Sequence, residues 1–483
     1  MLLLVSMFLL QFQMMPEHER HLTFFLTVTF AFVGFLIKGF MYYQTLQEAE
    51  KGSGMPIVVV AILSERSHLE RRKAIRETWL ADKGNVKAYF ILASKSCNIH
   101  PRDRLNDLSC EFFYPNITAG CLHMVEHTAC ASGAEGPTRI AIGFSFRLRY
   151  PVTLTKLGAL IHLQNVRVHL IDAVTKQVLS EAVVSDQDEE IGGYRYSAID
   201  PIKFSKNFEG ILMVTGNIST SCGASTFQQS DSIEFQRVYY DHVDEHSLPW
   251  RLDMTTLSAV SAEIALEGDP ELSTLNVLQR RRHWLKYIDL LDQMIISEMN
   301  KYKDIVTVDV VETYRNLPRK MSETFAHFSK QSLTFLVKAD DDVVLDLPRL
   351  KHILTTSLIT NRVVWAKTRR AFPISLYGKW AENVAFPSQV YPDFPCGATY
   401  VLSKDLVQFI AKNKGSLHHF QGEDVSVGTW LLGLAPQYLG EGLFSCGIQD
   451  CGGNVLNRAE VDSPEETRRI WNVYMQNKTL CDL

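Results

Sequence analysis

Residues 333–342 read "LTFLVKADDD", an apolar run that ends in three adjacent aspartates. The run predicts a buried strand, and the aspartates come directly after it, at the edge where open α/β sheets bind their ligands. Like charges this close repel, and burying them is costly without a counter-ion. Asp340 and Asp342 are two residues apart, so their side chains can converge on one hard cation such as Mg²⁺ or Mn²⁺. The alternative is a solvated turn, the usual place for such a triplet.

Strand and helix patterns on both sides of this stretch predict an α/β fold. Continuous apolar, β-branched runs predict further strands buried on both faces, at 57–63, 87–94 and 304–311. Ser67 and Glu70 have capping-box spacing, which predicts the start of a helix. A long helix is predicted over 274–302, where apolar residues recur at helical spacing: Leu278, Leu285, Ile288, Leu291 and Ile295.

Residues 138–240 have a different character, which predicts an insertion within the α/β pattern. "RIAIGFSFRLRY", residues 139–150, alternates apolar and polar residues, as a half-buried antiparallel strand does. Short strand-like runs separated by turn signals follow it, and they predict a small β-sandwich. A β-sandwich specifies no ligand, so acceptor binding and simple stabilisation both remain open for it.

The N-terminal region predicts a membrane anchor. The chain has 483 residues, and its composition, with 46% hydrophobic and 21% charged residues, is that of a globular protein. "LTFFLTVTFAFVGFLI", residues 22–37, carries no charge, and with the following residues it nearly reaches the roughly 20 residues that a span needs. The alternative is a cleaved signal peptide, but the residues after the apolar run are bulky. The net charge of −5 gives no sign of nucleic-acid binding.

Features after this apolar run predict a lumenal body. Glycosylation sequons lie at Asn116, Asn217 and Asn477, and all nine cysteines also follow the run. The chain has no Cys-x-x-Cys pair, so disulfides in an oxidising compartment are favoured over a zinc site. Their connectivity cannot be read from the sequence. We therefore expect a type II membrane protein with a short cytosolic tail.

Two further charged groups are candidates for chemistry. "HFQGEDVSVGTWLLGL", residues 419–434, places Glu423 and Asp424 before an apolar helix. Asp424 is either a helix cap or a functional carboxylate, and the helix dipole there should keep it ionised and make it a weak base. Arg72 and Arg76 are four residues apart and share one helix face, which is either a functional or a solvated face.

Four blocks in order make the chain resemble the β-1,3-glycosyltransferase family of the secretory pathway. They are "RKAIRETW" (72–79), "YKDIVTVDVVETYRNLPRK" (302–320), "KADDD" (338–342) and "EDVSVG" (423–428). The resemblance implies a type II membrane protein with a nucleotide-sugar-binding, GT-A-like α/β catalytic domain. The expected organisation, combining residue patterns and resemblance, is a cytosolic tail (1–21), a transmembrane anchor (22–43), a stem (44–55), a first catalytic part (56–115), an inserted β-rich domain (116–245) and a second catalytic part (246–483).

The resemblance also implies roles for single residues. Asp424 would be the catalytic base, and Asp340 and Asp342 would hold Mn²⁺ or Mg²⁺ and the diphosphate. The expected UDP-sugar site contains Asp340, Asp341, Arg72 and Arg76, although the two arginines are equally expected to brace the nucleotide pocket. The expected acceptor pocket contains Gly397, Tyr400, Glu423 and Trp380. Structural hydrogen bonding is the favoured role for Asp309, Glu312 and Tyr314.

Four features are most similar to certain members of the family: the insertion, "GKW" (378–380), "FQGEDVS" (420–426) and "YPDFPCGATYVLSKD" (391–405). Those members add β-1,3-linked N-acetylgalactosamine from UDP-GalNAc to N-acetylglucosamine on O-mannosyl glycans, in the endoplasmic reticulum and Golgi. The expected partners are therefore a UDP-sugar, a glycoprotein glycan and a membrane. Thr399 departs from the family's G-x-G-Y pattern and would add bulk beside the acceptor pocket. Galactosyl or N-acetylglucosaminyl transfer, glycan binding without catalysis, and a metal-dependent phosphoesterase are the alternatives.

Overall fold

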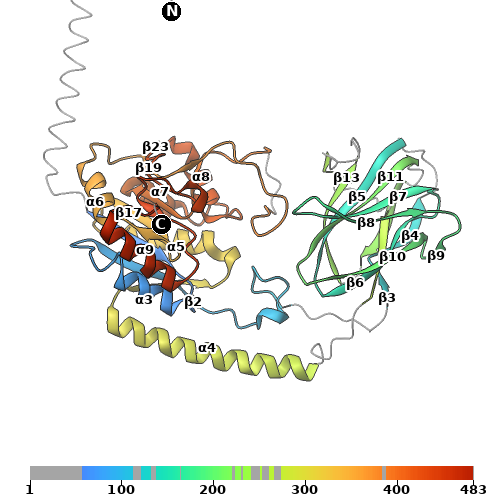
Figure 1. Ribbon diagram of the computed structural model, residues 1–483, viewed down its shortest axis with the longest axis horizontal. Helices are drawn as coiled ribbons and strands as arrows, with labels where there is room; N and C mark the ends of the chain where they lie inside the picture. The colour runs from blue at the N-terminus through green and yellow to red at the C-terminus, as the bar shows by residue number, and fades with distance from the viewer. Residues whose placement is uncertain are drawn as a thin grey trace, which may run out of the picture. The chain divides into compact units, whose positions relative to one another are not determined.

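The computed structural model describes residues 57–112, 121–131, 138–163, 165–219, 223–229, 232–240, 251–252, 260–265, 274–382 and 388–481 (Figure 1). The predicted anchor at 22–43, the tail, the stem and the sequon at Asn116 lie outside these ranges. Within the described part of the chain, no helix has the length and apolar character needed to cross a membrane.

A seven-stranded sheet lies at the centre of the α/β part, in the order β16-β2-β1-β17-β22-β19-β23. The first four strands are parallel, β22 runs antiparallel to both β17 and β19, and β23 is parallel to β19. This confirms the predicted α/β sheet, with the antiparallel strand β22 next to its central strand β17. The strands are β1 (Val58–Leu63), β2 (Lys87–Lys95), β16 (Ile305–Val311), β17 (Phe335–Asp340), β19 (Val363–Trp365), β22 (Thr399–Ser403) and β23 (Gln437–Leu439).

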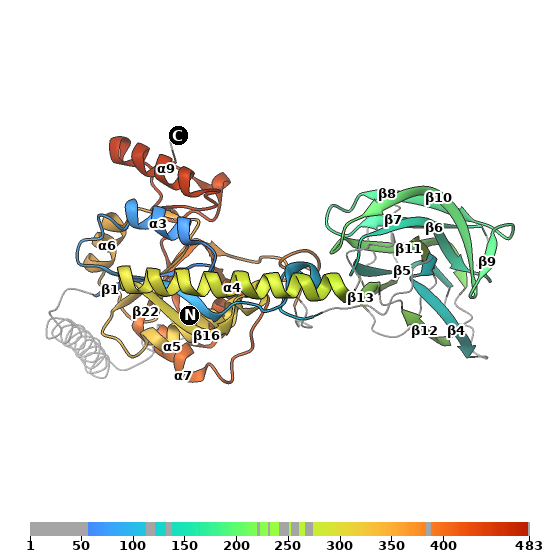
Figure 2. The ribbon, with the colours of Figure 1, turned by 90° about the horizontal axis from the view of Figure 1, so that it is seen from below.

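Helices cover both faces of this sheet, so its central strands are buried on both sides. Successive residues of β1 enter opposite cores: Val58 and Val60 pack on one side, Val59 and Ala61 on the other. Figure 2 shows α3, α6 and α9 on one side of the sheet and α5 and α7 on the other. The helices are α3 (Leu69–Glu77), α4 (Thr274–Tyr302), α5 (Leu317–Phe328), α6 (Leu347–Thr356), α7 (Lys404–Asn413), α8 (Glu423–Leu431) and α9 (Pro464–Asn477).

Two helix predictions need correction. The capping box is wrong: α3 begins at Leu69 with His68 as its N-cap, and the Ser67 hydroxyl donates to Glu65 instead. In α4, Leu291 and Ile295 are buried as predicted, but Leu278 and Leu285 are exposed. The apolar spacing of α4 therefore predicts the helix correctly and its buried face only in part.

The described residues between 121 and 265 form antiparallel sheets. A five-stranded sheet (β3-β15-β6-β10-β9) and a six-stranded sheet (β14-β13-β5-β11-β7-β8) contribute to one apolar core, which includes Phe144, Leu157, Leu212 and Val260. β15 lies beyond residue 245, where the insertion was predicted to end. The strands are β3 (Cys121–His123), β5 (Thr138–Leu148), β6 (Val152–Leu160), β7 (Val166–Asp172), β8 (Val178–Val184), β9 (Glu189–Ile191), β10 (Tyr194–Phe204), β11 (Glu209–Ser219), β13 (Ile233–Tyr240), β14 (Arg251–Leu252) and β15 (Val260–Ala265), with β4 (Val125–Ala131) and β12 (Gly223–Gln229) as a separate pair.

Disulfides close three loops of the described chain. They join Cys97 to Cys110, Cys396 to Cys446, and Cys451 to Cys481. The second lies next to Gly397 and therefore constrains the segment that leads into β22. Of the predicted sequons, Asn477 is the last residue of α9 and is exposed, and Asn217 belongs to β11.

Candidate active site

The three aspartates lie at the end of β17, at the carboxyl edge of the parallel strands. Asp340 is the last residue of β17, and Asp341 and Asp342 form the turn that follows. Two backbone bonds hold this turn: the Asp340 N–H donates to Ala398 O (3.1 Å), and the Val461 N–H donates to Asp342 O (2.9 Å). The acids are therefore fixed at the predicted place.

A buried lysine lies between the aspartates and a second acidic segment. Lys338 is 1% exposed, and its Nζ lies 2.8 Å from Asp340 Oδ1 and 2.7 Å from Glu423 Oε1. It also donates to the Gly397 carbonyl. Burial alone would lower the pKa of Lys338, but the attraction of Asp340 and Glu423 outweighs it and raises the pKa. Lys338 is therefore a permanent cation that joins the two acidic segments.

Asp424 enters the same site from the first turn of α8. Its Oδ2 accepts a hydrogen bond from the Gly397 N–H (3.1 Å), and its Oδ1 accepts one from the Val425 N–H (2.8 Å). A Cβ on Gly397 would lie 3.0 Å from Asp424 Oδ2, so glycine permits this close approach. The N-cap of α8 is Gly422 rather than Asp424. The capping alternative for Asp424 is therefore wrong.

Burial sets the protonation of these acids. Removal from water, with repulsion from Glu423, raises the pKa of Asp424 to about 6. This corrects the expectation of a fully ionised, weak base, because desolvation outweighs the helix dipole and the two N–H donors. Desolvation raises the pKa of Asp340 to about 7, and repulsion from Asp342 and Glu423 adds to this shift. The attraction of Lys338 lowers the pKa but does not outweigh them. Desolvation and Asp341 raise the pKa of Asp342.

These carboxylates fit a divalent cation. Lys338 contributes one positive charge against Asp340, Asp342, Glu423 and Asp424, so a further cation would relieve the repulsion among these four acids. Among the residues that the structure describes, no cluster of three or more His, Cys, Asp or Glu side chains could hold an ion by itself. Mg²⁺ is commonly bound by one or two carboxylates together with substrate phosphates. Asp340 and Asp342 match that arrangement.

Asp341, the middle aspartate, faces a different partner. Its Oδ2 lies 2.9 Å from His68 Nδ1, and it also bonds the Ser64 hydroxyl. Burial alone would raise the pKa of Asp341, but the bonds to His68 and Ser64 outweigh burial and lower the pKa. The Asp341 bond in turn raises the pKa of His68. Asp341 therefore ties the turn after β17 to the segment after β1, and it is the partner of His68 rather than of the neighbouring aspartates.

The two arginines from the predicted site have structural roles. Arg72 is fully buried, and its guanidinium donates to Glu298, the Ser64 hydroxyl and backbone carbonyls. Arg76 pairs with Asp304 and Glu298 at 2.7 Å. Both arginines link α3 to α4 or to Asp304, which follows α4. The bracing alternative therefore applies, and this geometry does not support the expected contact with the nucleotide sugar.

Arg71, which lies outside the sequence motif, acts electrostatically on the acids. Its charge lowers the pKa of both Asp341 and Asp342. Its guanidinium is held by the carbonyls of Val461 and Asp462, at 2.8 and 2.7 Å. These acceptors carry no full charge, so Arg71 keeps its positive charge available at the edge of the acidic site.

Two residues predicted beside the acceptor pocket are buried. Tyr400 is fully buried, and its hydroxyl donates to Glu423 Oε2 (2.9 Å). It supports Glu423 from behind and does not line a pocket. Thr399 is 1% exposed, with its hydroxyl on the Ala398 carbonyl. The predicted extra bulk beside the acceptor pocket is therefore wrong.

Trp380 is 64% exposed, and its side chain is hydrogen-bonded to the Tyr314 hydroxyl. Desolvation, together with Asp424 and Glu423, raises the pKa of Tyr314 to about 12. Tyr314 thus lies by the acids rather than serving the fold alone. Glu312 pairs with buried Lys320 (2.9 Å), and Asp309 pairs with Lys95 on the surface (3.0 Å), which agrees with the structural role favoured for both.

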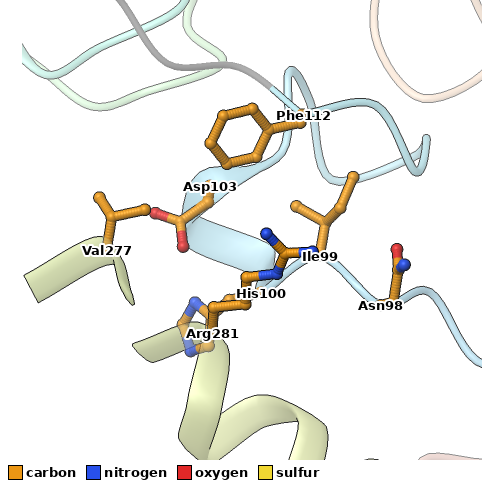
Figure 3. A pocket seen from close by; sticks show the side chains of 7 residues that line it. All are labelled: Asn98, Ile99, His100, Asp103, Phe112, Val277 and Arg281. Carbon is orange, nitrogen blue, oxygen red and sulfur yellow. The ribbon is translucent and has the colours of Figure 1, made fainter. Parts of the chain in front are cut away.

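A separate cavity of about 250 Å³ lies between the segment 98–112 and the start of α4 (Figure 3). His100 and Asp103 line it from the first segment, and Val277 and Arg281 from α4. None of its lining residues belongs to the acidic site. The sequence contains no motif that predicts this cavity, because the two segments are far apart in the chain.

The sequence contains weak signals for three site residues outside the predicted set, Lys338, His68 and Arg71. Lys338 is a charged residue inside an otherwise apolar strand, which indicates a buried charge that needs partners. His68 and Arg71 precede the block "RKAIRETW" and so fall just outside the motif. The motif therefore contains Arg72 but not its neighbour Arg71.

Comparison with known proteins agrees with this geometry. Residues 288–438 match the family model described as galactosyltransferase. The chain is 28% identical to UDP-GalNAc:beta-1,3-N-acetylgalactosaminyltransferase 2 of Xenopus laevis, over 88% of this chain and 90% of the relative. It is 29% identical to the human protein of the same name, over 86% and 87%. A probable beta-1,3-galactosyltransferase 5 of Arabidopsis thaliana is 32% identical over 34% of this chain and 42% of the relative.

The matched domain contains β17, the three aspartates and α8, and so includes every acid of the site. The relatives named for N-acetylgalactosaminyl transfer also align with most of the remaining chain. The chain is therefore a UDP-sugar-dependent glycosyltransferase, and its acidic site lies within the region that matches the galactosyltransferase model.

Proposed function

We propose that the protein transfers N-acetylgalactosamine from UDP-GalNAc, with inversion, to the 3-hydroxyl of a β-linked N-acetylglucosamine on a glycoprotein glycan of the O-mannosyl type. The observation that carries the proposal is the position of Lys338, which contacts Asp340 and Glu423 and so joins the acids after β17 to the segment that bears Asp424. Inverting transfer needs both a donor site and a base, and this arrangement supplies them side by side. The names of the relatives support the choice of sugar and linkage.

Asp424 is the proposed base. Its carboxylate accepts the proton of the acceptor hydroxyl while the hydroxyl oxygen bonds to C1 of the donor sugar and the bond from C1 to the diphosphate breaks. The Gly397 and Val425 N–H groups each hold one carboxylate oxygen and so fix its orientation. With a pKa of about 6, Asp424 is mostly ionised at neutral pH and still basic enough to take a proton.

Asp340 and Asp342 are the proposed ligands of Mn²⁺ or Mg²⁺. Such an ion, when bound, offsets the negative charge of the departing diphosphate. Lys338 holds the Asp340 carboxylate in place through a 2.8 Å contact. Arg71 lies near Asp342 and adds positive charge beside the expected diphosphate.

We also propose that this site faces the lumen of the Golgi or endoplasmic reticulum, behind a type II anchor at 22–43. Three disulfides and the exposed sequon at Asn477 support an oxidising, glycosylating compartment. Protease treatment of sealed microsomes tests this orientation. The body should be protected until detergent is added, whereas cleavage in intact vesicles would contradict it.

The decisive experiment offers the purified protein a panel of UDP-sugars with β-linked N-acetylglucosamine acceptors and Mn²⁺, and identifies products by mass spectrometry. We expect addition of one N-acetylhexosamine from UDP-GalNAc, in β-1,3 linkage by NMR. Preferential transfer from UDP-galactose or UDP-GlcNAc would replace the proposed donor. Absence of transfer to every acceptor would leave only sugar binding and overturn the catalytic proposal.

A further inference from the structure

A second cavity, of about 340 Å³, lies beside the active site and has a lining of apolar surface interrupted by polar groups. The β-rich part contributes Asp172, Val174, Asn207 and Phe208, the segment after Cys97 contributes Asp107, and the segment after Tyr377 contributes Lys379. We call this the side cavity. No residue of the side cavity belongs to the four family blocks, so its function is not implied by them.

Buried contacts hold the wall that contains Gly378. Glu209 is 6% exposed and pairs with Arg147, whose Nε lies 2.9 Å from Glu209 Oε1. The other carboxylate oxygen of Glu209 accepts the Gly378 N–H at 2.5 Å. Tyr377 packs against an apolar cluster that includes Ile171 and Met213. The wall is thus anchored to the β-rich part, which favours a preformed cavity over an incidental surface hollow.

The same loop connects the side cavity to the active site. Lys379 Nζ lies 4.5 Å from the centre of the Tyr314 ring, and the Lys379 carbonyl accepts a hydrogen bond from the Gln421 amide (3.2 Å). Gln421 is two residues before Glu423, and Tyr314 is hydrogen-bonded to Trp380 beside the acids. The side cavity and the proposed acceptor side of the active site therefore share one wall.

The lining combines groups that suit a sugar. Asp107 and Asp172 each use one carboxylate oxygen within the protein, for the Asn207 amide and for a turn, so the other oxygen of each is left for hydroxyl groups, and Lys379 donates. Asn207 Oδ1 has no hydrogen-bond partner within the described part of the chain. Val174 and Phe208 supply apolar surface for the C–H face of a ring. The lining carries three carboxylates (Asp107, Asp172 and Glu209) against two cations (Arg147 and Lys379), so neither sign of charge dominates strongly and a neutral carbohydrate matches best.

Building on the function proposed above, we propose that the side cavity binds the inner sugar of the acceptor glycan, the one next to the sugar that receives N-acetylgalactosamine. The β-rich part would then determine acceptor specificity by recognising the glycan beyond its terminal residue. Binding energy from such a remote contact favours the correct acceptor without changing the reacting groups. The chemistry at Asp424 should therefore be unaffected when the side cavity is blocked.

Val174→Trp tests this by filling the cavity. Val174 is 61% exposed, so the change should not disturb a core. Val183→Trp is the matched control, because Val183 is 54% exposed on β8 and does not line the cavity. Asp107→Ala, at an exposed position, is a second variant that removes a polar group instead of adding bulk. Thermal unfolding of all three variants should match that of the wild type.

Two acceptors separate the side cavity from the active site. Methyl β-N-acetylglucosaminide carries no inner sugar, whereas a glycopeptide with N-acetylglucosamine on mannosyl-threonine does. We expect Val174→Trp to raise KM for the glycopeptide at least tenfold and Asp107→Ala to raise it severalfold. For the methyl glycoside, both variants and the control should keep wild-type kcat and KM. Equal effects on the two acceptors, or no effect on either, would overturn the proposal.

Direct binding keeps the test independent of catalysis. Calorimetry with the glycopeptide, in the presence of UDP and Mn²⁺, should show binding by the wild type and Val183→Trp and at least tenfold weaker binding by Val174→Trp. If binding follows this pattern but no sugar is transferred, the proposed reaction fails and the side cavity stands. If the wild type binds the glycopeptide no more tightly than the methyl glycoside, the side-cavity proposal fails whatever the reaction.

Discussion

Lys338 Nζ lies 2.7 Å from Glu423 Oε1, and Lys338 stands between apolar neighbours in β17. The residues are 85 positions apart in the sequence, and their contact holds the two acidic segments of the site together. Lys338→Met would leave Glu423 and Asp340 without their cation. Since breaking a buried ion pair from one side costs about 3–5 kcal/mol, we expect urea denaturation to show a loss of that size in the free energy of unfolding.

The double variant Lys338→Met with Glu423→Gln provides the control. It removes one charge of each sign and should recover part of the lost stability while remaining inactive. If Lys338→Met alone is as stable as the wild type, the lysine does not compensate these acids. The stabilising role assigned to the contact would then be wrong.

Asp342→Asn tests the metal site. We expect transfer to fall by about 10²–10³-fold, the scale of losing one group that stabilises developing charge, and UDP to bind more weakly in Mn²⁺. Asp309→Asn is the matched control, because Asp309 is also an aspartate near a strand end but pairs only with groups on the surface. Activity of Asp342→Asn that persists with a chelator present would show that no metal acts through this residue.

Arg72→Met separates bracing from donor binding. Arg72 is fully buried against Glu298, so its loss should lower the free energy of unfolding by about 3 kcal/mol. The dissociation constant for UDP should stay within twofold of the wild-type value, measured by calorimetry below the unfolding temperature. Arg71→Met should do the opposite, weakening UDP binding with little loss of stability. Weaker UDP binding by Arg72→Met alone would restore the arginine to the donor site.

The strands of the central sheet are predictable because each is a continuous apolar run. Successive residues of β1 and β17 enter opposite cores, so nearly every residue of these strands is apolar, and this is visible in the sequence. The three aspartates are predictable for a related reason, since charges directly after a buried strand must lie at the edge of the sheet. Local sequence thus suffices where burial alone decides the structure.

Partners far apart in the chain explain the failures. The fate of Arg72 depends on Glu298, which is 226 residues away, and that of Tyr400 on Glu423. The spacing of α3 gives Arg72 and Arg76 a shared face but does not say what lies opposite. Ser67 has the spacing of a cap, yet the helix begins at Leu69, because the Ser67 hydroxyl pairs with Glu65. Such choices are made by tertiary contacts.

The pH dependence of transfer tests Asp424 as the base. Desolvation, with Glu423, raises its pKa to about 6, so kcat/KM should be constant near pH 7–8 and fall about tenfold per unit below pH 6. A bound cation would stabilise the ionised carboxylate and move the fall in kcat/KM to a lower pH, never to a higher one. A fall in kcat/KM that begins well above pH 7 would point to a different base.

Asp424→Asn completes this test. As a base, Asp424 should contribute about 10²–10⁴-fold to kcat, and the amide cannot accept the proton. The dissociation constant for the UDP-sugar should be unchanged, because Asp340 and Asp342 remain. A carboxyl whose pKa is raised in the folded state stabilises the fold only while it is protonated, and this contribution is lost as the pH rises past about 6. At pH 8 the uncharged amide should therefore match or exceed the wild type in stability. Near-normal kcat would contradict the assignment, and a large loss of stability would mean that Asp424 serves the fold.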